Sequence, residues 1–158
     1  DHKIRTIAQI EQSLKTKGIN FAQLVQAVLL LCGSGTLSAV QDEATIIKAK
    51  KHSDKLNSHL LQKARSSHDI SYLSSPVTGG GVFVGRFQQL FVLAARQGKK
   101  KPEELAEFAS QLLTAQGQKI LIEGKPIETA DKQLAELINQ ANEFVVKQLP
   151  ILKALQIA

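Results

Sequence analysis

The sequence predicts a mainly α-helical fold with small β-hairpins, and three observations support this. Apolar residues recur at helical spacing along most of the 158-residue chain. Glycines follow several of these stretches, at Gly18, Gly98 and Gly117. Only short segments, such as "QKILIEGKPIE", have the pattern of strands. A helix–helix–hairpin order is typical of winged-helix proteins, and it recurs in both halves of the sequence. We therefore expect one domain over 1–158, with 1–70 and 71–158 as candidate winged-helix-like sub-units.

Two helices are expected at the start of the chain. An apolar stripe over residues 4–14 predicts a first helix, and Gly18 stops it. Asn20 is placed to cap a second helix over residues 21–32, because its side-chain oxygen can accept a free N–H of the first turn. This second helix is apolar on nearly every side, which predicts a central core helix with a buried thiol at Cys32.

The middle of the chain predicts one short strand, one long helix and a loop. The stretch "GSGTLSAVQ", ending at Gln41, is interpreted as a turn and a strand. Asp42 starts a helix that continues to about Ser66, with apolar anchors separated by lysines. The following residues, 66–82, are rich in turn formers and are expected to be irregular.

The last third of the chain predicts three helices and a hairpin. A helix is expected over residues 86–97, and another over 102–116 has a proline at its first position, where a missing N–H costs nothing. The hairpin should turn at Glu123-Gly124-Lys125. Thr129 then caps a long amphipathic helix that Pro150 is expected to break.

Composition limits the classes of protein to consider. The single cysteine excludes an internal disulfide and is typical of a reducing compartment, so we expect a cytoplasmic protein. No apolar run reaches the roughly 20 residues that a bilayer requires, so no membrane partner is expected. The absence of methionine predicts that the chain is part of a longer polypeptide. A net charge of +6 permits a nucleic acid or another anionic partner but does not require one.

The loop in "SSPVTGGGVFVGR" is the candidate phosphate or interface loop. Gly79, Gly80 and Gly81 suit a phosphate loop in composition, but no buried strand precedes them and no Gly-Lys-Ser/Thr follows. We therefore interpret them as turn residues that supply positive φ and backbone clearance. Arg86, at the start of the next helix, is expected to be free to pair with a carboxylate of a neighbouring domain.

Histidines and the cysteine give no pattern typical of a metal or catalytic site. His52 and His59 are two helical turns apart, whereas a ligand pair on one helix needs a spacing of three or four. His2 and His68 stand apart from them. We predict exposed or helix-capping histidines, with no catalytic, cofactor-binding or metal-binding residue in this chain.

Lysines on the long third helix form the candidate basic surface. These are Lys48, Lys50, Lys51 and Lys55, which we expect to face an acidic partner or substrate. An alternative is a free-standing winged-helix nucleic-acid-binding protein. That function is less favoured, because the candidate reading helix over 102–116 carries three glutamates and no lysine or arginine, and phosphates would repel it.

From Tyr72 onward the sequence resembles a known family. The matching stretches are "YLSSPVTGGGVFVGR" from Tyr72 to Arg86, "QQLFVLA" from Gln88 to Ala94, "LTAQGQ" with "EGKPIET" within Leu113 to Thr129, and "LPILKALQI" from Leu149 to Ile157. Together they resemble the C-terminal region of bacterial class I S-adenosylmethionine-dependent methyltransferases that carry a methyltransferase regulatory domain, among them rickettsial-type protein lysine methyltransferases. The preceding residues match only loosely, through "LNSHLLQKAR".

This resemblance implies a non-catalytic regulatory and substrate-recognition module. In that family the C-terminal region is winged-helix-like, and the catalytic domain with its S-adenosylmethionine site precedes it. No family catalytic or cofactor residue therefore maps onto this chain. The implied partners are the catalytic domain of the same polypeptide, a protein substrate, and a second copy in a homodimer.

Overall fold

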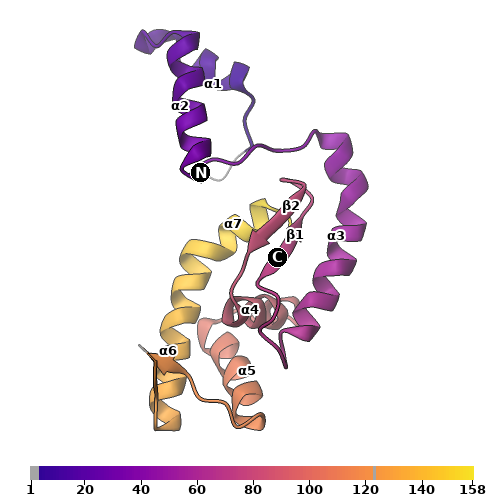
Figure 1. Cartoon of the computed structure of the whole chain (residues 1–158), viewed down its shortest axis with the longest axis vertical. Helices are drawn as coiled ribbons and strands as arrows, with labels where there is room; N and C mark the ends of the chain where they lie inside the picture. The colour runs from indigo at the N-terminus through magenta and orange to yellow at the C-terminus, as the bar shows by residue number, and fades with distance from the viewer. Residues whose placement is uncertain (1–3, 123) are drawn as a thin grey trace.

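The computed structural model describes residues 4–122 and 124–158 and confirms a mainly α-helical fold with two antiparallel hairpins. The elements, in order, are α1 (Ile7–Leu14), η1 (Lys15–Lys17), α2 (Phe21–Gly33), α3 (Glu43–Lys63), β1 (Tyr72–Ser75), β2 (Gly80–Phe83), α4 (Arg86–Arg96), α5 (Pro102–Ala115), β3 (Leu121–Ile122), β4 (Lys125–Pro126), α6 (Ala130–Glu143), the π-helical turn η2 (Phe144–Gln148) and α7 (Leu149–Ala154). Figure 1 shows α3 on one side of the main body, α6 and α7 on the other, and β1–β2 between them.

Polar caps begin the helices of the first half, largely as the sequence predicts. Asn20 accepts the N–H of Gln23, whose side chain accepts the N–H of Asn20 in return. This capping box satisfies N–H groups that have no partner inside α2. Asp42 caps α3 in the same position. Thr129 precedes α6 as expected, but its side chain makes no capping hydrogen bond.

The core lies among α3, the β1–β2 hairpin and α4 to α7, and α4 is its central helix. Six consecutive residues of α4, from Gln89 to Ala94, are buried, so this helix is covered on every side. The rings of Phe91 and Phe144 lie 5.5 Å apart and join α4 to the end of α6. Burial of this kind, at about 25 cal/mol per Å² of apolar surface, is the main stabilising contribution to such a body.

The prediction that α2 is the central core helix is wrong. Leu24 is its one buried residue, while Leu29 and Leu30 are 67% and 68% exposed. The thiol of Cys32, expected to be buried, is exposed as well. The physical reason is connectivity, because residues 34–42 form turns and an extended link that carries α1 and α2 away from the main body (Figure 1).

The strands also differ from the sequence prediction. No strand forms over the described residues 4–70, so the strand expected at "GSGTLSAVQ" is absent and this half lacks its hairpin. Residues 66–82, expected to be irregular, instead contain β1 and part of β2, paired from Tyr72 opposite Phe83 to Ser75 opposite Gly80. The helix–helix–hairpin order is present as α4, α5 and β3–β4. A winged-helix likeness for that part stays a prediction.

The second hairpin and the C-terminal helices complete the body. β3 and β4 pair antiparallel where the sequence predicts a hairpin. Of the expected turn residues, Gly124 has a φ of 78°, and Glu123 lies outside the described residues. Pro150 does not break the chain's helical path, because it occupies the first turn of α7, where proline is tolerated. The apolar tail packs internally, with Ile157 fully buried.

Candidate functional site

Helix α3 presents a positively charged face to solvent. Its buried residues are Ile46, Ser53, Asn57 and Leu61, at the spacing of one helix face. The opposite side carries five exposed basic residues, and we call this set the α3 basic face: Lys48, Lys51, His52, Lys55 and His59. The described residues between Lys48 and His59 include one carboxylate, Asp54. The three lysines of this face therefore carry charge of a single sign along about 10 Å of helix, at 1.5 Å per residue.

Hydrogen bonds fix the rotation of α3 so that this face points away from the body. The side-chain amide of Asn57 donates to the carbonyl of Ser74 and accepts its N–H, both at 2.7 Å. The hydroxyls of Ser53 and Ser74 lie 3.1 Å apart. Because these contacts bind the inner side of α3 to strand β1, the lysines on the outer side cannot turn inward without breaking them.

The four lysines of the candidate basic surface do not share one environment. Lys50 is half-buried and forms an ion pair with Asp54, one turn further along α3. This pair neutralises Lys50, so it contributes little to the field that a partner would feel. Lys48, Lys51 and Lys55 are exposed, and no carboxylate of residues 4–122 or 124–158 forms an ion pair with them. Three of the four predicted lysines therefore remain on the surface.

The glycine loop is a tight turn in which only one glycine has an unusual conformation. Gly79 has a φ of 71°, and a Cβ there would lie 2.3 Å from the side-chain nitrogen of Gln41. Gly80 and Gly81 belong to β2 and do not have positive φ, so the expectation of positive φ at all three glycines is wrong. Pairing with β1 holds Gly80 and Gly81 in the conformation of a β-strand, because they lie opposite Ser75 and Ser74.

Arg86 is not free for a neighbouring domain, contrary to the prediction. Its guanidinium donates to the carbonyls of Ala64 and Arg65 at 2.9 and 3.1 Å, at the C-terminus of α3. It also donates to the side-chain oxygens of Gln118 and Gln116, at 2.7 and 3.1 Å. Burial lowers the pKa of Arg86 below its ordinary value. The partly buried Arg86 therefore joins α3, α4 and the end of α5 within one chain.

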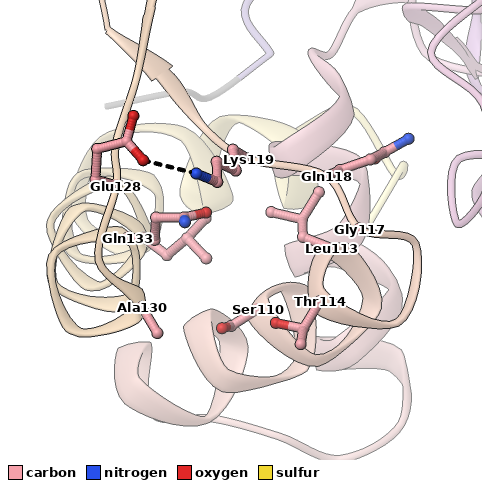
Figure 2. Close-up of a pocket in the computed structure, with 10 residues that line it drawn as sticks. Ser110, Leu113, Thr114, Gly117, Gln118, Lys119, Glu128, Ala130 and Gln133 are labelled. Atoms are coloured by element: carbon pink, nitrogen blue, oxygen red, sulfur yellow. Dashed lines mark hydrogen bonds and ion pairs between the residues drawn. The ribbon is translucent and has the colours of Figure 1, made fainter.

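A pocket of about 260 Å³ lies between α5, α6 and the segments that flank the β3–β4 hairpin (Figure 2). Lys119 and Glu128 form an ion pair at 2.8 Å beside it, and the lysine lowers the pKa of Glu128 by a hydrogen bond and by its charge. The Gln133 amide accepts the N–H of Ile120 and donates to the carbonyl of Ile127. These polar groups hold the hairpin against α6. The volume of the pocket is also below the roughly 300–1,000 Å³ that is typical of small-molecule sites. We therefore assign it a structural role.

In the part of the chain that the structure describes, the histidines do not belong to a cluster of side chains that could bind a metal ion. His52, His59 and His68 are exposed, as predicted, and His2 lies outside the described residues. Over 4–122 and 124–158 there is no group of three His, Cys, Asp or Glu side chains arranged to hold a metal ion.

In the same residues no helix combines the length and the apolar character needed to cross a membrane.

Two features of the α3 basic face were missed in the sequence. The sequence prediction treats His52 and His59 as exposed or helix-capping and does not assign them to the basic surface, although their spacing from Lys48 and Lys55 places all four on one side of a helix. The sequence prediction also does not include Asn57, whose hydrogen bonds to Ser74 keep the α3 basic face pointing to solvent. A polar residue at the spacing of the buried positions of α3 was the available signal.

The chain is similar along most of its length to a longer cyanobacterial protein. No protein-family model matches the chain, and no solved structure matches it. A protein of the cyanobacterium Synechocystis sp., named "Uncharacterized protein sll1526", is 34% identical over 153 residues, which are 97% of this chain and 29% of that relative. The chain thus spans less than a third of the relative's length.

Proposed function

We propose that this chain is a non-catalytic regulatory and substrate-recognition module of an S-adenosylmethionine-dependent methyltransferase of the protein lysine type, and that the α3 basic face binds an acidic protein partner. The observation that carries the recognition role is the set of exposed lysines, Lys48, Lys51 and Lys55, on a helix whose other side is fixed to the core. The resemblance of residues 72–157 to methyltransferase C-terminal regions supplies the enzyme class. The cofactor and the catalytic groups belong to another part of the polypeptide.

Charge and length support this proposal. A row of cations at helical spacing attracts a protein surface rich in aspartate and glutamate and orients it before contact. The longer Synechocystis relative supports a module within a larger polypeptide, because residues similar to this chain make up 29% of it. A cytoplasmic location, favoured by the single cysteine, suits a protein-modifying enzyme.

The recognition role is tested with a fluorescent peptide of alternating glutamate and glycine, and a glutamine–glycine peptide as the uncharged control. Fluorescence anisotropy should show binding of the acidic peptide that weakens as salt is added, because exposed charge pairs are screened. The triple variant Lys48→Glu, Lys51→Glu, Lys55→Glu should weaken binding at least about tenfold, at about 0.5 kcal/mol or more per exposed pair.

A matched triple variant separates the α3 basic face from net charge. Lys125→Glu, Lys132→Glu and Lys153→Glu reverse three exposed lysines elsewhere and change the total charge by the same amount. This variant should keep most of the peptide affinity. Equal losses in the two variants would show that the peptide follows overall charge, and the assigned recognition face would be wrong.

The enzyme class is tested on the native polypeptide, purified from source cells with an antibody against this chain. It should transfer radioactive methyl groups from labelled S-adenosylmethionine to a protein acceptor. A native polypeptide without this activity would contradict the methyltransferase assignment and leave the peptide-binding result standing.

Nucleic acid is the alternative ligand for the same lysines. Helix α5 carries Glu103, Glu104 and Glu107 and no basic residue between Pro102 and Ala115, which disfavours it as a helix that reads bases. A labelled DNA duplex in the same assay distinguishes the two ligands. Binding of DNA in preference to the acidic peptide would replace the proposed function with nucleic-acid binding.

A further inference from the structure

The β1–β2 hairpin has one covered edge and one open edge. Ser74 of β1 uses its outward N–H and C=O to bind the side chain of Asn57, so helix α3 covers the β1 edge. β1 lies between α3 and β2 (Figure 1), and β2 pairs with no further strand among the residues that the structure describes. β2 is therefore the edge to which another strand can be added.

The register of the hairpin decides which groups of β2 face the open edge. Val84 donates its N–H to the carbonyl of Ser71 at 2.9 Å, so this pair is hydrogen-bonded across the hairpin. Hydrogen-bonded and non-hydrogen-bonded pairs alternate in an antiparallel ladder. Phe83 and Gly81 therefore belong to pairs of the second kind, in agreement with the bonds that Ser74, opposite Gly81, makes to α3. Their N–H and C=O groups point outward from β2.

These four outward groups of β2 have no hydrogen-bond partner within residues 4–122 and 124–158. Gly81 and Phe83 are both exposed, so a ligand can reach the groups. Donors and acceptors repeat every second residue along the edge, which is the pattern that the main chain of an extended peptide complements. The open edge of β2 therefore fits an added strand.

An aromatic pair lies beside this edge. The rings of Tyr72 and Phe83 meet edge to face with their centroids 5.7 Å apart, although the two residues are 57% and 66% exposed. Gly81 adds no side chain, and the ring of Tyr72 lies over it. Aromatic and β-branched side chains on neighbouring strands stabilise each other. An added strand with such a residue opposite Phe83 would extend the aromatic pair.

The hairpin lacks the residues that usually prevent strand addition. Natural edge strands often carry lysine or proline, which discourage pairing with other chains. β4 has both, at Lys125 and Pro126. In contrast, no charged residue lies between Ile70 and Gly85, and Pro76 lies in the turn rather than in β2. This difference between the two hairpins favours β2 as a binding edge.

The size of the edge favours a short peptide segment as its ligand. The four residues of β2 offer about 13 Å of edge, at roughly 3.3 Å per residue. A strand of this length buries far less than the roughly 800 Å² that each partner contributes to a stable interface between folded proteins. A second copy is disfavoured as well, because two chains of net charge +6 repel each other.

We infer that the outer edge of β2 is a peptide-binding site, which takes an extended segment of a partner protein as a third strand with an aromatic or β-branched residue opposite Phe83. This site goes beyond the proposed function, because it shares no residue with the α3 basic face. It recognises main-chain groups and an apolar side chain instead of charge.

An NMR titration tests the inference with a short uncharged peptide of alternating threonine and valine around a central phenylalanine. The amide signals of Gly81 and Phe83 should shift and exchange more slowly with solvent, because their N–H groups gain partners. The Val82 amide should change less, since Val82 already pairs with Leu73. The control peptide carries N-methyl groups on two consecutive central residues, which removes a donor from each of its edges. It should bind at least about tenfold more weakly.

A matched pair of variants at Gly81 separates the main-chain bonds from other contacts. Gly81→Pro removes an outward N–H but no bond within the hairpin, and proline is tolerated on the solvent side of an edge strand. It should weaken peptide binding at least about tenfold while the circular dichroism of wild type is kept. Gly81→Ala keeps the N–H, and its Cβ would meet the nearest atoms at an ordinary 3.5 Å, so binding should change less than about threefold. Equal affinities of the two variants, or wild-type shifts confined to the α3 basic face, would overturn the inference.

The native polypeptide, purified from source cells as above, shows where the added strand comes from. It should bind the peptide with the affinity of the 158-residue chain. Binding by the chain but not by the native polypeptide would show that a segment of the same polypeptide fills the edge. Shifts of the Gly81 and Phe83 amides with protein concentration alone would show that a second copy fills it. Either result would overturn the assignment to a partner protein.

Discussion

The buried side-chain amide of Asn57 makes two hydrogen bonds to the main chain of Ser74, one as donor and one as acceptor, each 2.7 Å long. Asn57 is 0% exposed, so water does not compete for these bonds. An edge strand such as β1 leaves N–H and C=O groups unpaired on its outer side. Asn57 pairs those groups and thereby holds α3, with its basic face outward, against the hairpin.

Replacing Asn57 with leucine should destabilise the fold by about 3 kcal/mol, because two partly buried main-chain groups of Ser74 lose their partners. Urea unfolding followed by circular dichroism measures the change. Asn142→Ala is the control, since the exposed Asn142 amide donates only to the carbonyl of Ile138 in its own helix. Equal stability of the two variants would show that the bonds to Ser74 contribute little.

Arg86→Lys should cost roughly 1.5–3 kcal/mol, because lysine cannot reproduce the four hydrogen bonds of the planar guanidinium. Thermal or urea unfolding measures this loss. Arg65→Lys, which keeps the main-chain carbonyl that Arg86 uses, should change stability by less than about 0.5 kcal/mol. An Arg86→Lys protein as stable as wild type would restore the idea that this arginine is available to another domain.

Gly79→Ala should destabilise the chain by about 1 kcal/mol, since its φ of 71° is unfavourable for alanine and the added Cβ forces the Gln41 side chain to move. Gly80→Ala is the neighbouring control. A Cβ there meets no atom and the residue lies in strand β2, so the substitution should be neutral or slightly stabilising. Similar losses at both positions would contradict the assignment of a single turn-forming glycine.

Asp42 should make α3 sensitive to acid. The hydroxyl and N–H of Thr45 donate to its carboxylate and hold the pKa of Asp42 below its ordinary value of 3.8. Because the folded pKa is lowered, the contribution to stability is complete above the unfolded pKa and is lost as the pH falls through the folded pKa. Urea midpoints should therefore fall less between pH 5 and pH 2 in Asp42→Asn than in wild type.

A second variant isolates the cause of the Asp42 shift. Thr45→Val removes the hydroxyl donor and should raise the Asp42 pKa towards its ordinary value, as measured by NMR titration of the carboxyl group. An unchanged Asp42 pKa in this variant would rule out the side-chain hydrogen bond as the leading cause.

Local signals along the chain were sufficient to predict most helices and their ends. Capping by Asn20 and Asp42, and a helix stop at Gly18, depend on hydrogen bonds and φ values within a few residues, so the sequence carries them directly. The π-helical turn before Pro150 was not predicted, because π-helical turns are rare and no local pattern in residues 144–148 distinguishes them from an α-helix.

The sequence by itself determined the mainly helical class, the helix ends and the presence of lysines at helical spacing on α3. Only the tertiary structure decided which sides of those helices are covered. The sequence of an apolar helix does not show whether the helix fills a core or remains uncovered. Helix α2 has the composition of a core helix, but it is exposed because its connection carries it away from the body. The ion pair of Lys50 with Asp54, in contrast, joins residues four apart on one helix, so the sequence carried this signal and the prediction did not use it. Burial is a property of contacts between segments that are distant in the sequence, and it therefore required the structure.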